Sequence, residues 1–188
     1  MTGYGRCMVI GILAAAVLLM GCNQEMRYVR VGEYRNVAMN PDDVRGPAES
    51  YPHAESNSEC RNEACFAARN VIDGKTANTG HGPLWPSWGP DQRNDLWLKI
   101  DFGVPVETDK VVIYIRADFP HDNYWRSGII EFSDGSSETI ALQKTASAQV
   151  FQFTPRQTRW IRFTNLVGED PPGWCGFTEV EVWGWRLK

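Results

Sequence analysis

The segment LWLKIDF, residues 96–102, alternates apolar and polar side chains with a period of two. Because successive side chains of a β-strand point to opposite faces, this alternation predicts a strand with one buried face. Similar runs, rich in β-branched and aromatic residues and bounded by Gly, Pro, Asp or Ser, continue to the C-terminus. They are KVVIYIR (110–116), GIIEFS (128–133), ETIALQ (138–143), VFQFT (150–154), RWIRFTNL (159–166) and TEVEVWGW (178–185).

The spacing of these runs predicts the fold class. The pair Asp134-Gly135 lies between two of them and is typical of a tight hairpin turn. Many short strands without long helices predict an all-β sandwich or barrel. Residues 40–58 are rich in turn-forming types and predict a long surface loop with one short strand near 51–54, and residues 65–71 predict one helical turn.

The charge balance limits the partners. The chain has 19 Lys and Arg against 23 Asp and Glu, which gives a net charge of −4. The basic residues alternate with acidic ones and form no basic stripe, which argues against nucleic acid as the main partner.

The N-terminus predicts export. The apolar run 8–20 is too short for a comfortable spanning helix but suits the core of a signal peptide. It ends in LMGC, residues 19–22, which resembles a bacterial lipobox and implies cleavage before Cys22 and lipidation of its sulfur. The alternatives are an ordinary signal peptide or an uncleaved anchor. We therefore expect a signal peptide at 1–21, a polar tether at 22–34 and a folded domain at 35–188, on a membrane-anchored lipoprotein of the bacterial envelope (the outer membrane in a Gram-negative cell).

The cysteines predict one disulfide. An exported protein meets an oxidising compartment, where disulfides form and persist. Cys60 and Cys65 bracket the short segment CRNEAC and are the first choice for a pair. Pairing of Cys175 with either of them is the alternative.

Five of these segments, taken in order, resemble a known family. NVIDGKTANTGHG (70–82), LWLKIDFG, VVIYIR, RWIRFTNL and TEVEVWG are similar to the discoidin-like, or coagulation-factor type C, domains, which include the family 32 carbohydrate-binding modules. The resemblance covers about 35–184. It implies a galactose-binding-like jelly-roll β-sandwich of about 7–9 strands, with a long N-terminal loop region. The motifs are more specific for the fold than for a ligand.

The resemblance also implies a calcium ion. In the family a structural calcium sits at the turn that corresponds to Asp73-Gly74, and hard cations of this kind prefer oxygen ligands, many from backbone carbonyls. The positions that match the family site are Asn70 and Lys75 through their carbonyls, together with Asp73, Thr79, Thr178 and Glu179. Asn78 is an alternative to Thr79. The competing interpretation is a metal-free turn in which Asp73 caps backbone amides.

The loop RADFPHDNYW, residues 116–125, predicts a ligand site. Sugars are bound by an aromatic ring beneath their C–H face and by planar polar groups that donate and accept in fixed geometry. This loop supplies both kinds: Arg116, Asp118, His121, Asp122, Asn123, Tyr124 and Trp125. The alternative is that Phe119 and Trp125 cap the core while Arg116 and Asp118 form a weak surface ion pair.

Two further loops carry candidate residues. The segment HGPLWPSWGPDQRND, residues 81–95, offers His81, Trp85, Asp91 and Arg93, whereas we expect Trp88 to fill the core beneath the loop. Trp174 lies on another loop, before the last predicted strand, and is a candidate for the same end of the sandwich. Trp97, Trp160 and Trp183 lie within alternating strands and are expected in the core.

The motifs favour a binder over an enzyme. Asp118, His121 and Asp122 could serve as an acid–base set, but they share one short loop, and the chain has no nucleophile elbow, Gly-rich phosphate loop or His-rich zinc motif. The sequence therefore predicts a non-catalytic glycan-binding module. The alternative is a protein-interaction or envelope-structural lipoprotein with the same fold. Lipid-headgroup binding gains little support from the acidic balance.

Overall fold

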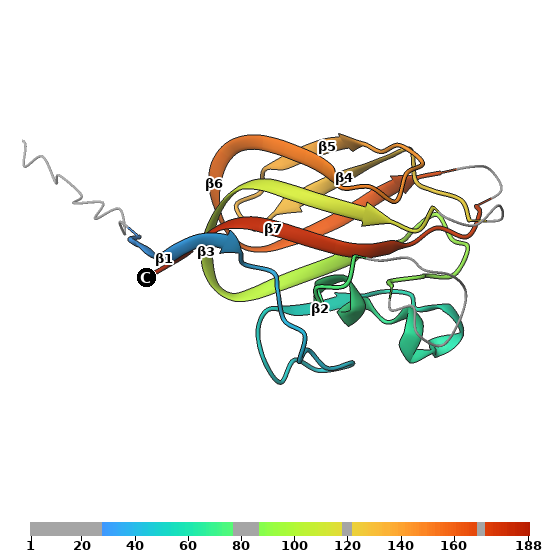
Figure 1. The fold of residues 1–188 in the computed structure, drawn as a ribbon, viewed down its shortest axis with the longest axis horizontal. Coiled ribbons are helices and arrows are strands. Elements are labelled where there is room, and N and C mark those ends of the chain that lie inside the picture. The colour runs from blue at the N-terminus through green and yellow to red at the C-terminus, as the bar shows by residue number, and fades with distance from the viewer. Residues whose placement is uncertain (1–27, 77–86, 118–121, 169–171) are drawn as a thin grey trace, which may run out of the picture.

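A computed structural model describes residues 28–76, 87–117, 122–168 and 172–188 (Figure 1). Seven antiparallel strands form the domain in the order β1-β7-β3-β6-β4-β5, with β2 paired to β3. The strands are β1 Arg30–Asn36, β2 His53–Ser56, β3 Leu98–Ile115, β4 Ser127–Phe132, β5 Ser137–Ala141, β6 Gln149–Val167 and β7 Phe177–Leu187. Three short 3-10 helices precede β3: η1 Cys60–Asn62, η2 Ala64–Phe66 and η3 Ala68–Ile72. The predicted all-β class is confirmed.

Two long strands, β3 and β6, belong to both layers of the sandwich. The first part of β3 pairs with β2 and with the end of β6, and from Val106 onward β3 pairs with β7 and with the beginning of β6. The register shifts between Asp101 and Val106, where the strand bends. Gly103 in this bend has a φ of +71°, and a Cβ there would lie 2.5 Å from Cγ of Tyr51. Segments that the sequence predicts as separate strands, 96–102 with 110–116 and 150–154 with 159–166, are thus largely joined into β3 and β6.

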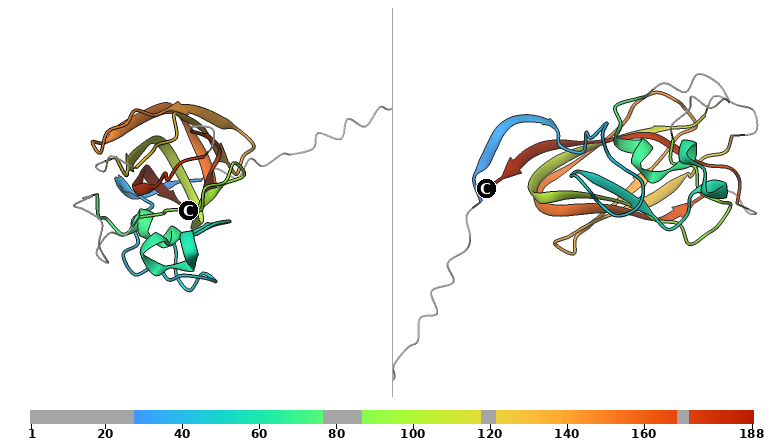
Figure 2. Two further views of the ribbon diagram at one scale, coloured as in Figure 1. Left: turned by 90° about the vertical axis from the view of Figure 1, so that its right-hand side faces the viewer. Right: turned by 90° about the horizontal axis from the view of Figure 1, so that it is seen from below.

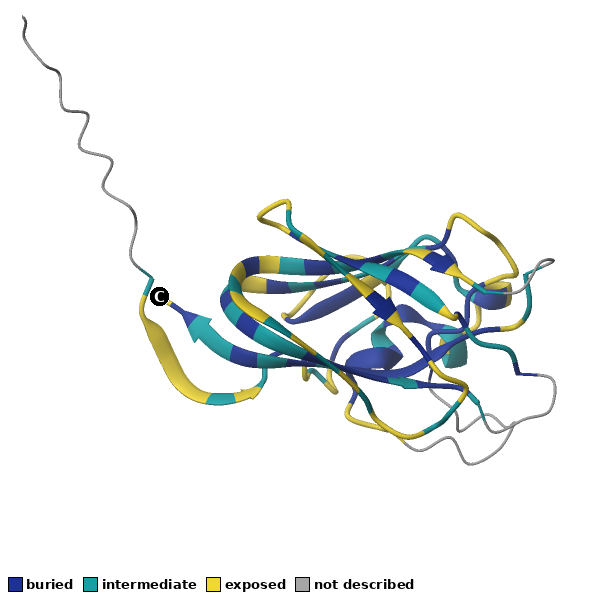
Figure 3. Ribbon diagram, turned by 90° about the horizontal axis from the view of Figure 1, so that it is seen from above, coloured by how far each residue is buried: buried dark blue, intermediate teal, exposed yellow. Residues whose placement is uncertain are grey.

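The core lies between the two layers. Buried and more exposed residues alternate along the strands, as the banded ribbon of Figure 3 shows. The predicted core positions of Trp97, Trp160 and Trp183 are wrong, because the alternation turns their neighbours Leu98, Ile161 and Val182 inward and leaves the indoles half-buried on the outer faces.

Two tryptophans from connecting segments fill the core instead. Trp88 is fully buried, as the sequence predicts, and its ring stacks on that of Trp125 with 5.4 Å between centroids. The Trp88 Nε1–H donates a hydrogen bond to the carbonyl of Ser58, at 2.9 Å, which satisfies the polar atom of a buried indole. Phe177, at the start of β7, packs against both rings.

Strand β1 includes the last residues of the segment predicted as a tether, 22–34. It pairs with β7 from Arg30 opposite Leu187. The Tyr34 ring lies 4.6 Å from that of Trp185, and its hydroxyl donates to Oδ1 of Asp109 at 2.6 Å. Burial, and then the hydrogen bond to Asp109, raises the pKa of Tyr34 well above its usual value. The folded domain therefore begins before residue 35.

The segments between β1 and β3 lie beside the sandwich. Figure 2 shows β2 and the three 3-10 helices gathered on one side of it. The predicted helical turn at 65–71 corresponds to η2 and η3, and the predicted strand near 51–54 corresponds to β2. Within the described residues, no helix is long and apolar enough to span a membrane; the run 8–20 lies outside them.

Candidate ligand-binding site

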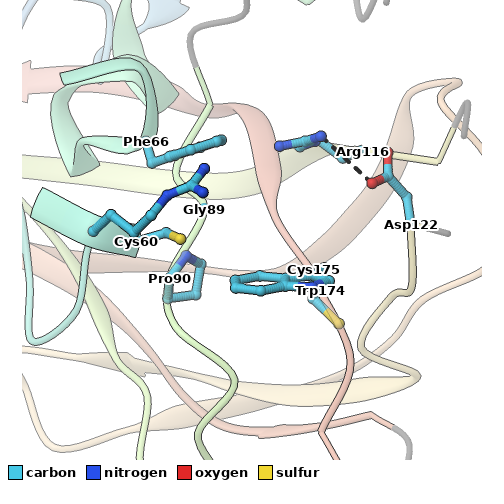
Figure 4. A pocket seen from close by; sticks show the side chains of 9 residues that line it. Cys60, Phe66, Gly89, Pro90, Arg116, Asp122, Trp174 and Cys175 are labelled. Atoms are coloured by element: carbon cyan, nitrogen blue, oxygen red, sulfur yellow. Dashed lines mark hydrogen bonds and ion pairs between the residues drawn. The ribbon is translucent and has the colours of Figure 1, made fainter. Parts of the chain in front are cut away.

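A cavity of about 300 Å³ opens where β3 ends and β7 begins, beside η1 and η2 (Figure 4). Segments that are distant in the sequence form its walls. The lining residues are Cys60, Arg61, Phe66, Gly89, Pro90, Arg116, Asp122, Trp174 and Cys175.

Backbone hydrogen bonds hold these segments together. Trp88 and Phe177 form an isolated antiparallel bridge, with N···O distances of 2.8 and 3.1 Å. On one side of this bridge the Cys60 N–H donates to the carbonyl of Gly89, and on the other the Arg116 N–H donates to that of Gly176. A Cβ on Gly176 would lie 2.8 Å from the carbonyl oxygen of Trp88, so a side chain there would push the two segments apart. The cavity is thus built on a fixed backbone frame.

Arg116 and Asp122 supply its polar wall. The Arg116 residue is 8% exposed, and its Nη2 lies 3.4 Å from Oδ1 of Asp122, which is 3% exposed. The guanidinium carbon of Arg116 lies 5.8 Å from the centroid of the Phe66 ring. Figure 4 shows the two charged side chains directed toward each other. A buried pair of this kind offers donors and acceptors in a fixed geometry, as recognition of sugar hydroxyls requires.

Trp174 supplies an aromatic wall. Its residue is 45% exposed, which makes it the most exposed tryptophan of the described residues. The Asn123 N–H donates to the carbonyl of Trp174 at 2.7 Å, so that the loop before β4 and the loop before β7 support each other. An exposed ring beside a buried polar pair is the combination that binds the apolar face and the hydroxyls of a sugar.

The structure brings three of the predicted ligand residues together in this cavity: Arg116, Asp122 and Trp174. Asn123 lies next to them, and its side chain packs where a Cβ on Gly173 would be placed. The half-buried Tyr124 packs against the core. Four other candidates, namely Asp118, His121, His81 and Trp85, lie outside the described residues.

The structure does not place Trp125 in this cavity; with Asp91 and Arg93 it borders a separate, small depression. The residue is 4% exposed and its ring is enclosed by Trp88 and Phe177, so it caps the core and does not face the cavity. Asp91 and Arg93 are also absent from the cavity wall. Asp91 accepts a hydrogen bond from the Ser58 hydroxyl, and Arg93 forms an exposed ion pair with Asp95.

Sequence reasoning missed the contribution of η1 and η2. Arg61 and Phe66 line the cavity, yet they lie in a segment assigned to a disulfide loop and a helical turn. In the sequence, only their position close to Cys60 sets these two residues apart. The bridge between Trp88 and Phe177 decides which loops meet, and no sequence pattern encodes it.

The predicted disulfide between Cys60 and Cys65 is wrong: both are free thiols. The chain at these cysteines forms two successive 3-10 turns, η1 and η2. Cys60 is buried and lines the cavity, whereas the Cys65 thiol lies 3.6 Å from Oε2 of Glu63. Burial raises the pKa of both thiols.

A second cluster of polar residues lies where the calcium site is expected. Both carboxylate oxygens of Glu179 lie 3.2 Å from the Gly74 N–H, while Oδ1 of Asp73 accepts from the Lys75 N–H at 2.9 Å. Glu179 is 1% exposed, and burial, followed by the charge of Asp73, raises its pKa to about 9. A cation between the two carboxylates would relieve this cost.

The other predicted calcium ligands differ in how they fit. The buried Thr178 hydroxyl has no hydrogen-bond partner among the described residues, which suits a ligand. The Asn70 side-chain nitrogen donates to the carbonyls of Ala64 and Ser87, and its backbone carbonyl remains a candidate ligand. Thr79 lies outside the described residues, and those residues contain no group of three or more His, Cys, Asp or Glu placed to hold a metal ion. A cation would therefore need carbonyl or hydroxyl ligands as well.

The chain belongs to the F5/8 type C domain family, whose model matches residues 53–180. This membership confirms the resemblance to the discoidin-like domains. A comparison with curated protein sequences finds no match.

Solved structures share the fold at low sequence identity. Chitosan-binding module 1 of a chitosanase/glucanase from Paenibacillus sp. IK-5 is 19% identical over 81% of this chain and 100% of its own, with a TM-score of 0.55. The family 32 carbohydrate-binding module of C. perfringens NanJ, solved with galactose, is 17% identical over 69% of this chain and 91% of its own, with a TM-score of 0.53. A fucolectin from striped bass, Morone saxatilis, is 20% identical over 82% of this chain and 50% of its own, with a TM-score of 0.58.

Proposed function

We propose that this domain binds a glycan, without catalysing a reaction, in the cavity formed by Arg116, Asp122 and Trp174. The observation that carries the proposal is an exposed indole beside a buried, ion-paired Arg and Asp at the rim of one cavity. Solved structures with this fold include a chitosan-binding module, a carbohydrate-binding module in complex with galactose and a fucose-binding module, which supports a glycan over other ligands.

Each side chain has a distinct role in this proposal. The Trp174 ring stacks on the apolar C–H face of a sugar ring. Arg116 donates to ring or hydroxyl oxygens, and Asp122 accepts from hydroxyls while holding the guanidinium in place. The cavity volume, about 300 Å³, is at the small end of ligand sites and suits the end of a glycan chain. Affinity at such a site is weak, so that firm adhesion depends on several copies acting together.

The absence of catalysis is part of the proposal. Glycoside hydrolysis uses a pair of carboxylates. Asp122, which pairs with Arg116, is the single carboxylate among the described residues that line the cavity. Incubation of the full-length chain with a bound, fluorescently labelled oligosaccharide should leave the oligosaccharide intact. Release of a shorter labelled product, lost in Asp122→Asn, would contradict the proposal.

Binding can be tested by calorimetric titration of the full-length chain in detergent against a panel of neutral and charged oligosaccharides. Saturable binding that is lost in Trp174→Ala and kept in Trp160→Ala supports the proposal, because Trp160 is a half-buried indole on the outer face of β6. No heat with any glycan from a folded protein would overturn it and favour a protein partner.

We propose, further, that a calcium ion binds between Asp73 and Glu179, with the Asn70 and Lys75 carbonyls, Thr178 and Thr79 as further ligands. The ion would neutralise the two carboxylates and tie the turn after η3 to β7, a structural role. The burial of Glu179 close to the charge of Asp73 supports this proposal. Isothermal titration of the chelator-treated chain with CaCl₂, beside Glu179→Gln, tests it.

The location of the protein remains a prediction from its first residues. We propose that Cys22 carries the lipid anchor and places the domain on the surface of a bacterial membrane, because the apolar run 8–20 and the residues LMGC suit a lipoprotein signal. Mass spectrometry of the chain expressed in a bacterium tests this proposal: a lipid-modified N-terminal Cys22, absent in Cys22→Ala, supports it, and an intact residue 1 contradicts it.

A further inference from the structure

Arg61 stands in a backbone conformation that its side chain does not favour. In η1 its φ is +51° and that of Asn62 is +58°, two successive residues other than glycine in the left-handed region. Such residues are uncommon and persist where the surroundings fix them, often at binding sites. This strained conformation therefore requires a structural or functional explanation.

The surrounding contacts hold this turn in place. The Arg45 guanidinium donates through Nη1 to the carbonyl of Asn62 at 2.9 Å, through Nη2 to its side-chain oxygen, and through Nε to Glu59. Glu59 in turn accepts from the N–H of Ala68 at 2.8 Å, and the Cys60 N–H donates to Gly89. Contacts on both sides thus fix the residues that flank Arg61.

The result is a second guanidinium on the cavity wall. Arg61 and Arg116 both line the cavity, and Asp122 is the single carboxylate among the described lining residues. Arg61 does pair with Glu63, at 3.0 Å between Nε and Oε1, but their side chains are 70% and 46% exposed. An exposed pair of this kind is weak and can be exchanged for a ligand at little cost.

We infer that the cavity selects a glycan that carries an anionic group, and that Arg61 contacts this group while Trp174, Arg116 and Asp122 bind the sugar. This inference rests on the proposed glycan-binding function and names its ligand class. Guanidinium groups match the planar arrangement of carboxylate and sulfate oxygens and form charge-assisted hydrogen bonds with them. The anionic group can be the carboxylate of an acidic sugar or a sulfate ester, and both present the same oxygens.

The test compares matched ligands and matched variants of the full-length chain. Calorimetry measures binding of a neutral galacto-oligosaccharide, an oligogalacturonate and a sulfated galacto-oligosaccharide, to separate the two sources of charge. The variants are Arg61→Gln, Arg61→Lys and, as a control, Arg159→Gln, which removes an exposed charge of β6 that does not line the cavity.

We expect at least one acidic ligand to bind about tenfold tighter than the neutral one, and Arg61→Gln to lose most of that preference, because hydrogen bonds between charged groups are the stronger ones. Arg61→Lys should keep part of the preference, and Arg159→Gln should keep all of it. The preference should also fall as salt rises, since screening weakens an exposed charge contact.

Arg61→Gly separates a ligand role from a structural one. Glycine accepts the positive φ, so this variant should be at least as stable as the parent in thermal unfolding while it loses the acidic preference. Equal binding of neutral and acidic glycans, unaffected by Arg61→Gln, overturns the inference and leaves the proposed function standing. No binding of any glycan overturns both.

Discussion

The Trp125 indole stacks on that of Trp88, with 5.4 Å between the ring centroids and 29° between the ring planes. One ring comes from the loop after β3 and the other from the segment before it, and Phe177 of β7 contacts both. This stack lies in the core, next to the bridge between Trp88 and Phe177 that holds the cavity-lining segments together. We therefore expect stability and ligand binding to depend on different tryptophans.

Trp125→Ala should destabilise the domain by about 3–5 kcal/mol, because it removes a large buried side chain and leaves a cavity in the core. Urea unfolding followed by fluorescence measures the loss. Trp160→Ala, a change on the outer face, is the control and should have a much smaller effect. A Trp125→Ala protein of normal stability that fails to bind glycan would mean that the ring faces a ligand after all.

Trp174→Ala should show the opposite behaviour. Because the residue is 45% exposed, its loss should change the free energy of unfolding by less than about 1 kcal/mol. The affinity for the glycan should fall by about tenfold or more, since a stacked ring contributes about 1 kcal/mol or more to such contacts. Titration and unfolding of the same preparation separate the two effects, and a variant with unchanged affinity would remove Trp174 from the site.

The chelator-treated domain should lose stability as the pH rises. The pKa of Glu179 is raised from 4.5 to about 9 in the folded state, so the folded state holds an extra proton between these values. The contribution of Glu179 to the free energy of unfolding is therefore fully present below about pH 4.5 and falls as the pH rises toward 9. In this range, folding must take up a proton that the unfolded chain has released. Thermal unfolding between these limits measures the trend, and Glu179→Gln should flatten it.

Calcium should reverse that trend. At about a hundredfold excess over its dissociation constant, the ion should add about 2.7 kcal/mol to the free energy of unfolding. It should act more strongly at pH 8 than at pH 5, because protons and the cation compete for the carboxylates. An unchanged melting temperature with CaCl₂ at pH 8 would show that no calcium binds and that Asp73 only caps the backbone amides of its turn.

The thiols should react as free groups with different rates. Cys65, which is partly exposed, should be labelled by a maleimide faster than Cys60, whose burial limits access to the thiol. Peptide mass spectrometry after timed labelling of the native chain measures both rates. If Cys60 and Cys65 were labelled only after reduction, the predicted disulfide between them would be correct.

Tyr34→Ala should lower the free energy of unfolding by about 1–2 kcal/mol, because it removes the ring between β1 and Trp185 and leaves the Asp109 carboxylate without its hydrogen bond. Glu33→Ala, an exposed neighbour on the same strand, is the control. Equal stability of the two variants in urea would mean that β1 behaves as the tether that the sequence predicts.

The sequence by itself determined the strands and the family. Period-two alternation is a local property, so runs such as 96–102 and 110–116 identify strands whatever they pair with. It also placed Arg116, Asp122 and Trp174 on loops, because each lies at or beyond the end of an alternating run. The motifs around Asp73 and Glu179 pointed to the F5/8 type C fold before any contact was known.

Only the tertiary structure decided which faces and loops meet. Alternation shows that every second residue of a strand is buried, but it does not show which of the two sets faces the core. Trp183 lies on the outer face, whereas Trp88 and Trp125, from irregular segments, fill the core. The bridge between Trp88 and Phe177 brings η1 to the end of β3 and thereby puts Arg61 and Arg116 on the wall of one cavity. A binding cavity depends on such long-range pairings, because contacts between segments far apart in the chain leave no periodic trace in the sequence.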